Sequence, residues 1–281
     1  MHTGGNGAKH VIAALEGSLR RLRTDYIDLY WVHVWDAVTP AEELLETMAA
    51  LVRSGRVRYW GLSNTPAWYV ATVATLAAVR GMPGPIALQC FYSLANRDVE
   101  DEHVPMAAER GLGLMPWSPL AYCLLAGTYD RATVESAAPR PAGVSGLPRD
   151  AAAAGEQRPA DDKRLDGANP FGASLFTDRN WRIVDELRRV AAEAGQTPAR
   201  MALAWVMGRP GVTSTLVGVS RAAQLLENVS ALDVVLSEDH RQALDRVSAP
   251  DPRMLSTLFT PALRQQVVFG GSPARAWREP T

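Results

Sequence analysis

The protein has 281 residues, of which 47% are hydrophobic, and its 29 lysines and arginines nearly balance 30 aspartates and glutamates, which gives a net charge of -1. This chain is long and apolar enough for a large buried core. Its balanced charge supplies no broad positive field, so neither nucleic acid nor an anionic membrane is an expected partner. No apolar run reaches the roughly 18 residues of a membrane helix, and we expect a cytoplasmic protein.

The cysteines and histidines do not indicate a metal site or a disulfide framework. Cys90 and Cys123 are far apart in the sequence, and the five histidines show no His-x-x-x-His spacing. Such spacings are what a zinc site or a disulfide-rich scaffold needs. We therefore expect no metal and two reduced, buried cysteines.

Taken in chain order, the sequence alternates helical patterns with short β-rich runs. A helix is predicted over 11–22, a strand over 26–33 and a crossover helix over 42–53, which opens at Thr39-Pro40 and closes at Gly55. Further strands are predicted over 59–63, 86–92, 112–117 and 213–218, and further helices over 181–194, 198–207 and 222–231. This alternation is typical of βα units around a parallel sheet. Most of these strands are too apolar for a sheet with one wet face, so we expect both faces to be covered.

The predicted elements form a single domain over 1–281 with two less regular parts. Residues 128–176 are rich in alanine, proline, glycine and arginine and have no sustained periodicity, so they are expected to form a long loop. Residues 249–281 are expected to form a C-terminal tail.

Five parallel strands are fewer than the length of the chain would allow. A (β/α)8 barrel needs about 250 residues, yet only five strands are predicted. An open sheet would leave two hydrophobic edges, which soluble proteins normally cover. Three explanations remain: a second chain completes the sheet, the fold is an open α/β sheet, or part of the protein is missing. Self-association or a partner chain is therefore expected.

Five segments, in order, resemble the aldo-keto reductases. Residues 18–33 are similar to the family's third helix and fourth strand, 55–64 to its Gly-Lys-(Val/Ile)-Arg-x-(Ile/Leu)-Gly-(Val/Leu)-Ser-Asn strand, and 89–94 to the next strand. Residues 117–120 resemble the turn after the seventh strand, and 218–228 the cofactor-binding eighth unit. The resemblance covers about residues 6 to 248. It implies a (β/α)8 TIM barrel, present in part as strands four to eight and without the family's N-terminal segment.

The resemblance also implies a function: the NADPH-dependent reduction of an aldehyde or ketone. The positions that match the family's cofactor site are Ser63, Asn64, Gln89, Trp117, Ser118, Pro119, Leu120, Gly218, Ser220, Arg221, Gln224 and Asn228. Ser63, Asn64 and Gln89 have the donors and acceptors that a carboxamide needs, and Trp117 has a face on which a nicotinamide can stack. Arg221, at the start of a predicted helix, suits a phosphate, which favours NADP(H) over NAD(H).

His33 matches the family histidine that orients and polarises the substrate carbonyl. The tyrosine, lysine and aspartate that complete the family's catalytic tetrad lie on its first three strands, and no position in this sequence matches them. Trp35 and Asp36 follow His33 and are expected to line the substrate pocket. The substrate is a small carbonyl compound that the sequence does not specify.

Each of these residues also has an ordinary structural use. A histidine at a strand end is often a packed, hydrogen-bonded group, and a Ser-Asn pair is common in turns and helix caps. Two departures from the family pattern weigh against cofactor binding: Ala121-Tyr122-Cys123 adds bulk where small residues are usual, and Gly127-Thr128-Tyr129 lacks the usual lysine. The alternative function is a divergent short homologue. It would act as a binding or assembly module, or as a non-redox enzyme that uses His33 with Tyr92 or Tyr122.

Overall fold

The computed structural model describes residues 4–136 and 172–272. These residues belong to two compact units that divide after Ser248. Most of the loop predicted at 128–176 and the end of the predicted tail lie outside the described residues. The first unit contains the sheet, and the second contains only short helices.

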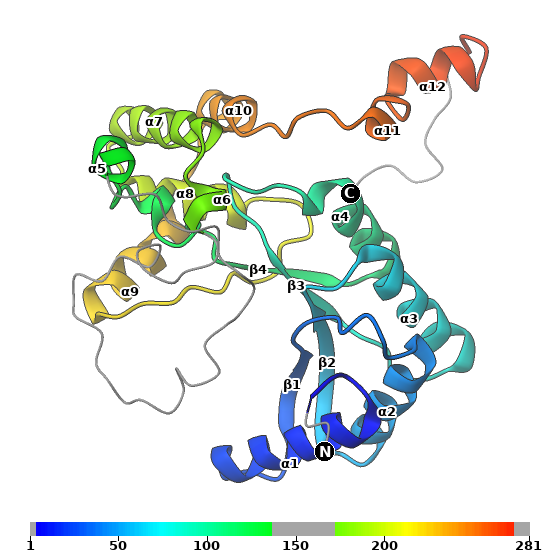
Figure 1. Cartoon of the computed structure of the whole chain (residues 1–281). Coiled ribbons are helices and arrows are strands. Elements are labelled where there is room, and N and C mark those ends of the chain that lie inside the picture. Colours follow the sequence, from blue (N-terminus) through cyan, green and yellow to red (C-terminus); the bar gives the residue numbers. More distant parts are fainter. Residues whose placement is uncertain (1–3, 137–171, 273–281) are drawn as a thin grey trace. The chain divides into compact units, whose positions relative to one another are not determined.

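The first unit is built on a parallel sheet of four strands in the order β1-β2-β3-β4 (Figure 1). The strands are β1 (Ile27–Val32), β2 (Val57–Ser63), β3 (Ala87–Phe91) and β4 (Gly113–Trp117). They confirm four of the five predicted strands, with ends that differ by no more than two residues. Because all four run in parallel, their carboxyl ends lie at one edge of the sheet.

Helices follow the strands in the expected alternation. In the first half these are α1 (Ala8–Leu22), α2 (Ala41–Arg53), α3 (Ala67–Arg80) and α4 (Val99–Arg110). After β4 come η1 (Leu124–Ala126), α5 (Arg131–Ser136), α6 (Gly172–Leu175), α7 (Asp178–Glu193), α8 (Pro198–Met207), α9 (Ala222–Val229), η2 (Ser230–Asp233) and α10 (Glu238–Val247). The helices predicted over 11–22, 42–53, 181–194 and 198–207 are confirmed. The helix predicted over 222–231 ends two residues earlier, where a 3-10 turn begins.

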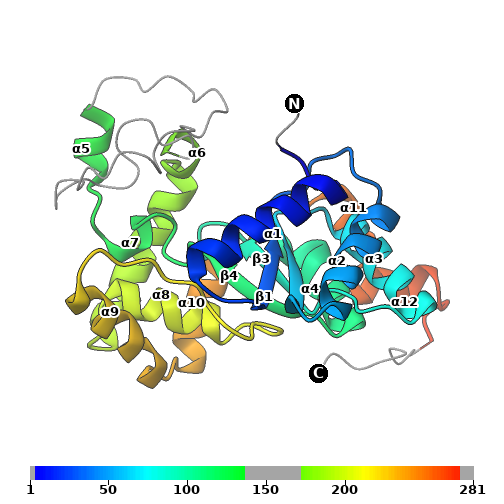
Figure 2. The same cartoon turned by 90° about the horizontal axis from the view of Figure 1, so that it is seen from below.

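One face of the sheet packs against helices. Figures 1 and 2 both show α2, α3 and α4 on the same side of the strands. The alternate side chains that point to this side are buried, among them Val32, Trp60, Leu62, Leu88 and Leu114. They join Leu15, Leu45, Met48 and Val73 of the helices in one hydrophobic core.

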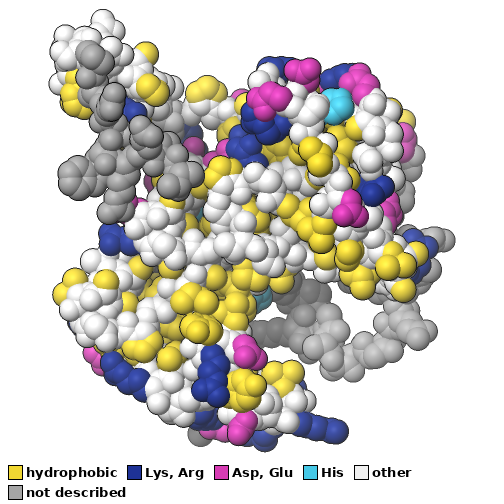
Figure 3. Space-filling view, turned by 180° about the vertical axis from the view of Figure 1, so that it is seen from behind, with side chains coloured by type: hydrophobic (Ala, Val, Ile, Leu, Met, Phe, Trp, Pro, Cys, Tyr) yellow, Lys and Arg dark blue, Asp and Glu magenta, His cyan; other side chains and the backbone are white. Residues whose placement is uncertain are grey.

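The opposite face of the sheet is more open over the described residues, and the expectation that both faces are covered stays a prediction. Cross-strand neighbours on this face pair Leu29 with Tyr59 and Phe91 with Trp117. Tyr59 is 57% exposed, and Leu29, Phe91 and Trp117 are only partly buried. Figure 3 shows a face of the molecule on which hydrophobic side chains gather in broad patches. The apolar sequence of a strand does not show by itself whether other elements pack on both faces of the sheet.

Trp31 lies flat on this open face, across Gly61 of the neighbouring strand. A Cβ atom built on Gly61 would come within 2.4 Å of the Trp31 ring and 2.8 Å of the Ala87 carbonyl oxygen. Only glycine fits at that point, since no real side chain tolerates such distances. Steric contact with Trp31 and Ala87 therefore explains why this position of the strand motif is glycine in this chain.

The fifth strand, predicted over 213–218, does not form a ladder. The segment touches β4 through two isolated parallel bridges, Leu114 with Val212 and Trp117 with Leu216. The offset between partners rises from 98 to 99 residues between these bridges, so the outer segment carries one extra residue, as in a β-bulge. Pro116 has no N–H to donate at this point of β4. A bulge opposite a proline explains why the apolar pattern does not produce a continuous strand.

A buried ionic network holds α10 to α4 and α8. Arg97 is 9% exposed and forms two hydrogen bonds with Glu100, at 2.9 and 2.8 Å. Arg209 donates to Asp245 at 3.0 Å, and the Trp205 indole donates to the same carboxylate oxygen at 2.9 Å. Because every charge here has a partner, the network costs less than its burial alone would suggest.

The second unit consists of α11 (Met254–Thr257) and α12 (Pro261–Val267) with the turns around them. Its large apolar side chains are mostly exposed, including Met254 at 81% and Val267 at 70%. Across the described residues of both units, no helix combines the length and the hydropathy that a membrane span requires.

Candidate functional site

The polar candidates meet at the carboxyl edge of the sheet. His33 follows β1, Ser63 ends β2 and Asn64 follows it, Gln89 lies within β3, and Trp117 ends β4. In open parallel sheets this edge is where ligands bind. The first four βα steps of the chain thus bring these residues from four separate segments to one place.

Asn64 connects these segments through its side-chain amide. Its Nδ2 atom donates to the carbonyl oxygen of His33 at 3.0 Å and to Ser63 Oγ at 2.9 Å. Its Oδ1 atom accepts from the indole Nε1–H of Trp117 at 3.0 Å. Ser63 Oγ then donates to Gln89 Oε1 at 3.3 Å. The result is a connected set of amide and hydroxyl groups that spans all four strand ends.

The backbone of Asn64 explains why asparagine stands there. Its φ of 48° lies in the left-handed region, which asparagine enters more readily than most residues. This turn ends the strand and directs the amide sideways across the sheet edge. Asn64 is therefore responsible both for the turn after β2 and for the hydrogen bonds between the strand ends.

Trp117 forms one wall of a pocket. Its ring lies 4.8 Å from that of Phe91, centroid to centroid, and 6.3 Å from that of Tyr122, edge to face. The pocket has a volume of about 170 Å³. Its lining residues are Trp117, Ser118, Pro119, Leu120, Tyr122, Cys123, Leu216, Val217, Gly218 and Asn228.

The loop after β4 accommodates the bulk of Tyr122 by an unusual backbone. Ser118, Ala121, Tyr122 and Cys123 all have positive φ, between 46° and 72°. The N–H of Tyr122 donates to Ser118 Oγ at 3.1 Å, which closes the turn. The pocket remains beside this loop, so the bulk that the sequence places here does not fill it.

Arg221 lies at the amino end of α9. Gln224 Oε1 accepts hydrogen bonds from the backbone N–H groups of Ser220 and Arg221, at 3.0 and 3.2 Å, and so caps the helix. The Arg221 side chain is exposed. A guanidinium beside a helix amino end is suited to an anionic group.

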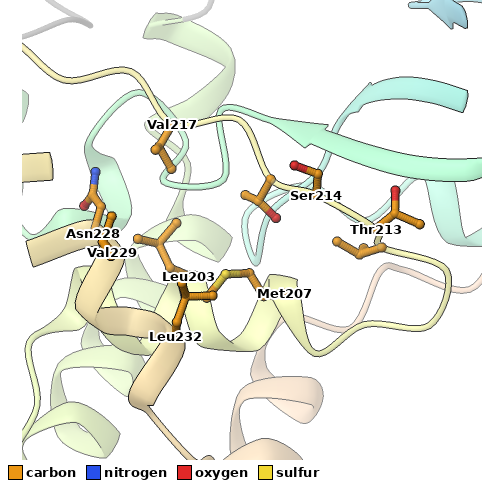
Figure 4. A pocket seen from close by; sticks show the side chains of 10 residues that line it. Leu203, Met207, Thr213, Ser214, Val217, Asn228, Val229 and Leu232 are labelled. Atoms are coloured by element: carbon orange, nitrogen blue, oxygen red, sulfur yellow. The ribbon is translucent and has the colours of Figure 1, made fainter. Parts of the chain in front are cut away.

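A larger pocket of about 430 Å³ adjoins the first one (Figure 4). Leu203 and Met207 of α8 and Val229 and Leu232 line its apolar side, and the hydroxyl residues 213–215 line the other. Val217 and Asn228 line both pockets. The Oγ1 atom of Thr215 is buried and has no hydrogen-bond partner within the described residues. The pocket therefore has an apolar side and a side that carries hydroxyl residues.

The loop after β1 places the candidate substrate residues. His33 is exposed, and Trp35 is partly buried. Partial burial opposes the charge of Asp36, but the Thr39 hydroxyl and the backbone N–H groups of Thr39, Asn6 and Val38 donate to the carboxylate and hold its pKa well below its ordinary value. These bonds fix the shape of the loop. That Trp35 and Asp36 touch a substrate stays a prediction.

The two tyrosines proposed as partners of His33 lie in different environments. Tyr92 is 2% exposed and donates to Glu100 Oε1 at 2.6 Å, within the ionic network. Burial and the charge of Glu100 raise its pKa, which makes Tyr92 a poor proton donor at this site. Tyr122 instead lines the smaller pocket beside Trp117. Of the two, only Tyr122 lies beside the candidate site.

Two aromatic residues near the site were not singled out from the sequence. Trp68 and Tyr69, at the start of α3, lie 5.6 and 6.0 Å from the ring of Trp35. Their signal was present, since they follow the Ser-Asn turn by four and five residues, but no helix was predicted there.

Burial raises the pKa of the Cys90 thiol to about 12, while Cys123 is only partly buried. Among residues 4–136 and 172–272, no cluster of three potential metal ligands occurs.

The sequence of this chain matches the model of one known protein family. The family model described as "Aldo/keto reductase family" matches residues 2–249. The chain belongs to the aldo/keto reductase family. The match covers both pockets and the connected amide cluster.

Curated relatives agree with this assignment. The chain is 33% identical over 233 residues to a probable voltage-gated potassium channel subunit beta of Oryza sativa subsp. japonica, across 82% of this chain and 64% of that protein. It is 31% identical to norsolorinic acid reductase A of Aspergillus parasiticus, across 86% of this chain and 53% of that protein. It is 32% identical to an uncharacterized oxidoreductase of Bacillus subtilis, across 83% of this chain and 62% of that protein. The chain thus spans between half and two thirds of the length of these family members.

Proposed function

We propose that the chain binds NADP(H) at the carboxyl edge of its sheet and takes part in the reduction of an aldehyde or ketone. The observation that carries this proposal is the hydrogen-bonded set of Ser63, Asn64 and Gln89 beside the ring of Trp117. A carboxamide needs both donors and acceptors, and this set supplies both. An aromatic wall gives a planar ring a face on which to stack.

The residues present fit a dinucleotide in two further respects. The two pockets adjoin through Val217 and Asn228, which gives an extended ligand a continuous path. The hydroxyl residues 213–215 line the larger pocket, and the exposed Arg221 guanidinium lies at the amino end of α9. An arginine fork binds phosphate strongly, so Arg221 favours a cofactor with a 2'-phosphate. When bound, the nicotinamide supplies the hydride.

His33 is the residue that we assign to the substrate carbonyl. Its imidazole is exposed at the end of β1, and its backbone carbonyl is held by Asn64 at 3.0 Å. A histidine there can donate a hydrogen bond to the carbonyl oxygen as negative charge develops on it. Further proton donors of the family pattern lie on strands that match no segment of this chain. We infer that the four described strands correspond to part of a (β/α)8 barrel.

Consumption of NADPH in the presence of a panel of aldehydes and ketones tests this proposal. We expect carbonyl-dependent oxidation of NADPH, reduced at least tenfold by His33→Ala. His103→Ala is a matched control, because that imidazole bonds the carbonyl oxygen of Thr65 at 2.9 Å and lies outside the assigned set. Saturable NADPH binding without oxidation by any carbonyl compound would contradict the reductase activity and leave the binding site standing.

A binding or assembly role is the second candidate, and the open face of the sheet favours it. Tyr59, Trp31 and Phe91 leave apolar surface uncovered in the described residues, and such surface commonly marks an interaction site. A relative is named as a channel subunit, which is a property of that protein. Light scattering tests the assembly role through self-association: an increase in mass with protein concentration supports self-association, and a constant monomer mass contradicts it.

A further inference from the structure

A basic pocket lies at the end of the sheet where β1 and β2 begin. It has a volume of about 670 Å³ and is lined by Glu16, Leu19, Arg20, Arg23, Thr24, Asp25 and Arg56. Thr24 lies in the segment before β1, and Arg56 directly precedes β2. The seven residues of β2 separate this end of the sheet from the candidate site by about 20 Å. The basic pocket is therefore distinct from the proposed cofactor site.

Three arginines from separate segments line the basic pocket. Arg20 belongs to the last turn of α1, Arg23 caps the carboxyl end of that helix, and Arg56 precedes β2. Arg56 donates a hydrogen bond to the Glu16 carboxylate, which holds its guanidinium in place. Arg20 and Arg23 are exposed and form no ion pair with the residues that the structure describes. Within the described chain, two of the three positive charges are therefore available to an anion.

The backbone conformation of Arg23 indicates that its side chain has a use. Arg23 has a φ of 55°, in the left-handed region that favours glycine at the end of a helix. Helices α3 and α4 end in the same conformation, and the residues there are Gly81 and Gly111. An arginine at such a position costs stability relative to glycine. An outlier of this kind at the rim of a pocket points to a function of the guanidinium.

The charges and the arrangement of the basic pocket suit a phosphate group. Guanidinium groups bind phosphate through paired N–H donors. A phosphate group has three acceptor oxygens that point in different directions, whereas a carboxylate has two in one plane. Guanidinium groups from three segments can therefore share one phosphate. The carboxylates of Glu16 and Asp25 also line the pocket, and against three arginines they leave a net positive charge that attracts a dianion.

We propose that the basic pocket binds the phosphate group of a small phosphorylated organic molecule. Arg20 and Arg23 bind the phosphate oxygens, and Arg56, oriented by Glu16, completes the set of donors. A volume of about 670 Å³ lies in the range of small-molecule sites, so the pocket has room for an organic group beside the phosphate. This site is separate from the proposed cofactor site and does not depend on the reductase activity.

An NMR titration with phenyl phosphate tests the proposal, with the backbone amide signals of residues 19–25 and 56 as the readout. Phthalate is the comparison, because both probes have an aromatic ring and carry about two negative charges near neutral pH. The titration is made at low ionic strength, where exposed charges are least screened. We expect phenyl phosphate to bind about threefold to tenfold more tightly than phthalate. Equal affinities, or no shift of these signals, would overturn the proposal.

The variant Arg23→Gly separates binding from folding. Because glycine is favoured at a φ of 55°, we expect the melting temperature of this variant to be unchanged or higher. Its affinity for phenyl phosphate should fall about threefold to tenfold, and Arg23→Lys, which keeps the charge, should lose less. Arg110→Ala is the matched control, since Arg110 is exposed in the last turn of α4 and does not line the pocket. Unchanged affinity in Arg23→Gly, or an equal loss in Arg110→Ala, would contradict the assignment.

Two further titrations distinguish this site from other phosphate contacts. Arg221→Ala removes the phosphate contact that we assign to the cofactor, and we expect phenyl phosphate to shift the signals of residues 19–25 in this variant as before. Loss of these shifts in Arg221→Ala would place the phosphate at the cofactor site and overturn the proposal. Inorganic phosphate is expected to bind more weakly than phenyl phosphate because it lacks the organic group. Equal affinity for the two would contradict a phosphorylated organic ligand and identify free phosphate as the ligand.

Discussion

The indole Nε1–H of Trp117 donates to Asn64 Oδ1 at 3.0 Å, which joins the end of β4 to the end of β2 across the strand between them. This bond orients the amide on which the proposed carboxamide contacts depend. In Trp117→Phe the ring remains and the donor is lost, so we expect NADPH to bind about fivefold more weakly, as one hydrogen bond implies. In Trp117→Ala the stacking surface is lost as well, and the affinity should fall further. NADPH fluorescence measures both effects.

Trp60→Phe is the control for this prediction. The Trp60 indole also donates one hydrogen bond, to the Pro83 carbonyl oxygen at 3.1 Å, but it is buried on the helix side of the sheet. We expect the Trp60→Phe substitution to lower the free energy of unfolding and to leave the affinity for NADPH unchanged. An equal loss of affinity in Trp60→Phe and Trp117→Phe would show that the effect is general destabilisation.

The two roles of Asn64 can be separated by two substitutions. Asn64→Ala removes the amide and leaves, at a φ of 48°, a residue that enters the left-handed region less readily than asparagine does. Asn64→Gly also removes the amide, but glycine adopts this backbone conformation without strain. We expect the alanine variant to be less stable than the glycine variant by about 1 kcal/mol in urea unfolding. Both should lose NADPH affinity to the same extent. Retained affinity in the glycine variant would contradict a role for the amide.

Asp36 predicts a pH dependence of stability. Its pKa in the folded chain lies below its ordinary value of 3.8. The group therefore stabilises the fold above that value, and this contribution is lost as the pH falls toward the lower folded pKa. Asp36→Asn should lower the free energy of unfolding by about 1–3 kcal/mol near neutral pH, and the difference from the unsubstituted chain should shrink below about pH 4.

Urea unfolding at a series of pH values measures this difference. Asp28→Asn is the control, because Asp28 is an exposed carboxylate on β1. A difference for Asp36→Asn that stays constant down to about pH 3 would show that the carboxylate charge does not stabilise the loop.

Arg221 predicts the choice of cofactor. Arg221→Ala should weaken NADPH binding about tenfold to a hundredfold, the range of a hydrogen bond to a charged group, and should leave NADH binding nearly unchanged. Arg182→Ala, at an exposed position of α7, should change neither. Equal losses for NADPH and NADH would place the guanidinium away from the 2'-phosphate.

The strands at 27–32, 57–63, 87–91 and 113–117 could be predicted because each is a short apolar run bounded by turn residues. The segment 213–218 has the same pattern, yet its pairing fails at Pro116 and at an extra residue, which depends on the partner strand. We did not predict α3 from the sequence because its alanine-rich segment is apolar on most sides of the helix. The periodic alternation of apolar and polar residues that indicates a helix is therefore weak.

The candidate site could be predicted in part, through the motifs that end each strand. That Ser63, Asn64, Gln89 and Trp117 contact one another follows from parallel strands, whose ends meet at one edge. The contact of Trp35 with Trp68 could not be predicted, since it depends on how two loops fold beside each other. The same limit applies to Tyr92, whose burial against Glu100 is a tertiary feature.

Calorimetric titration of the chain with NADPH and with NADH measures whether this site binds a nicotinamide cofactor. We expect saturable binding of one NADPH per chain, with NADH bound at least tenfold more weakly because the Arg221 contact is missing. No heat of binding with either nucleotide would contradict a cofactor site at the carboxyl edge of the sheet.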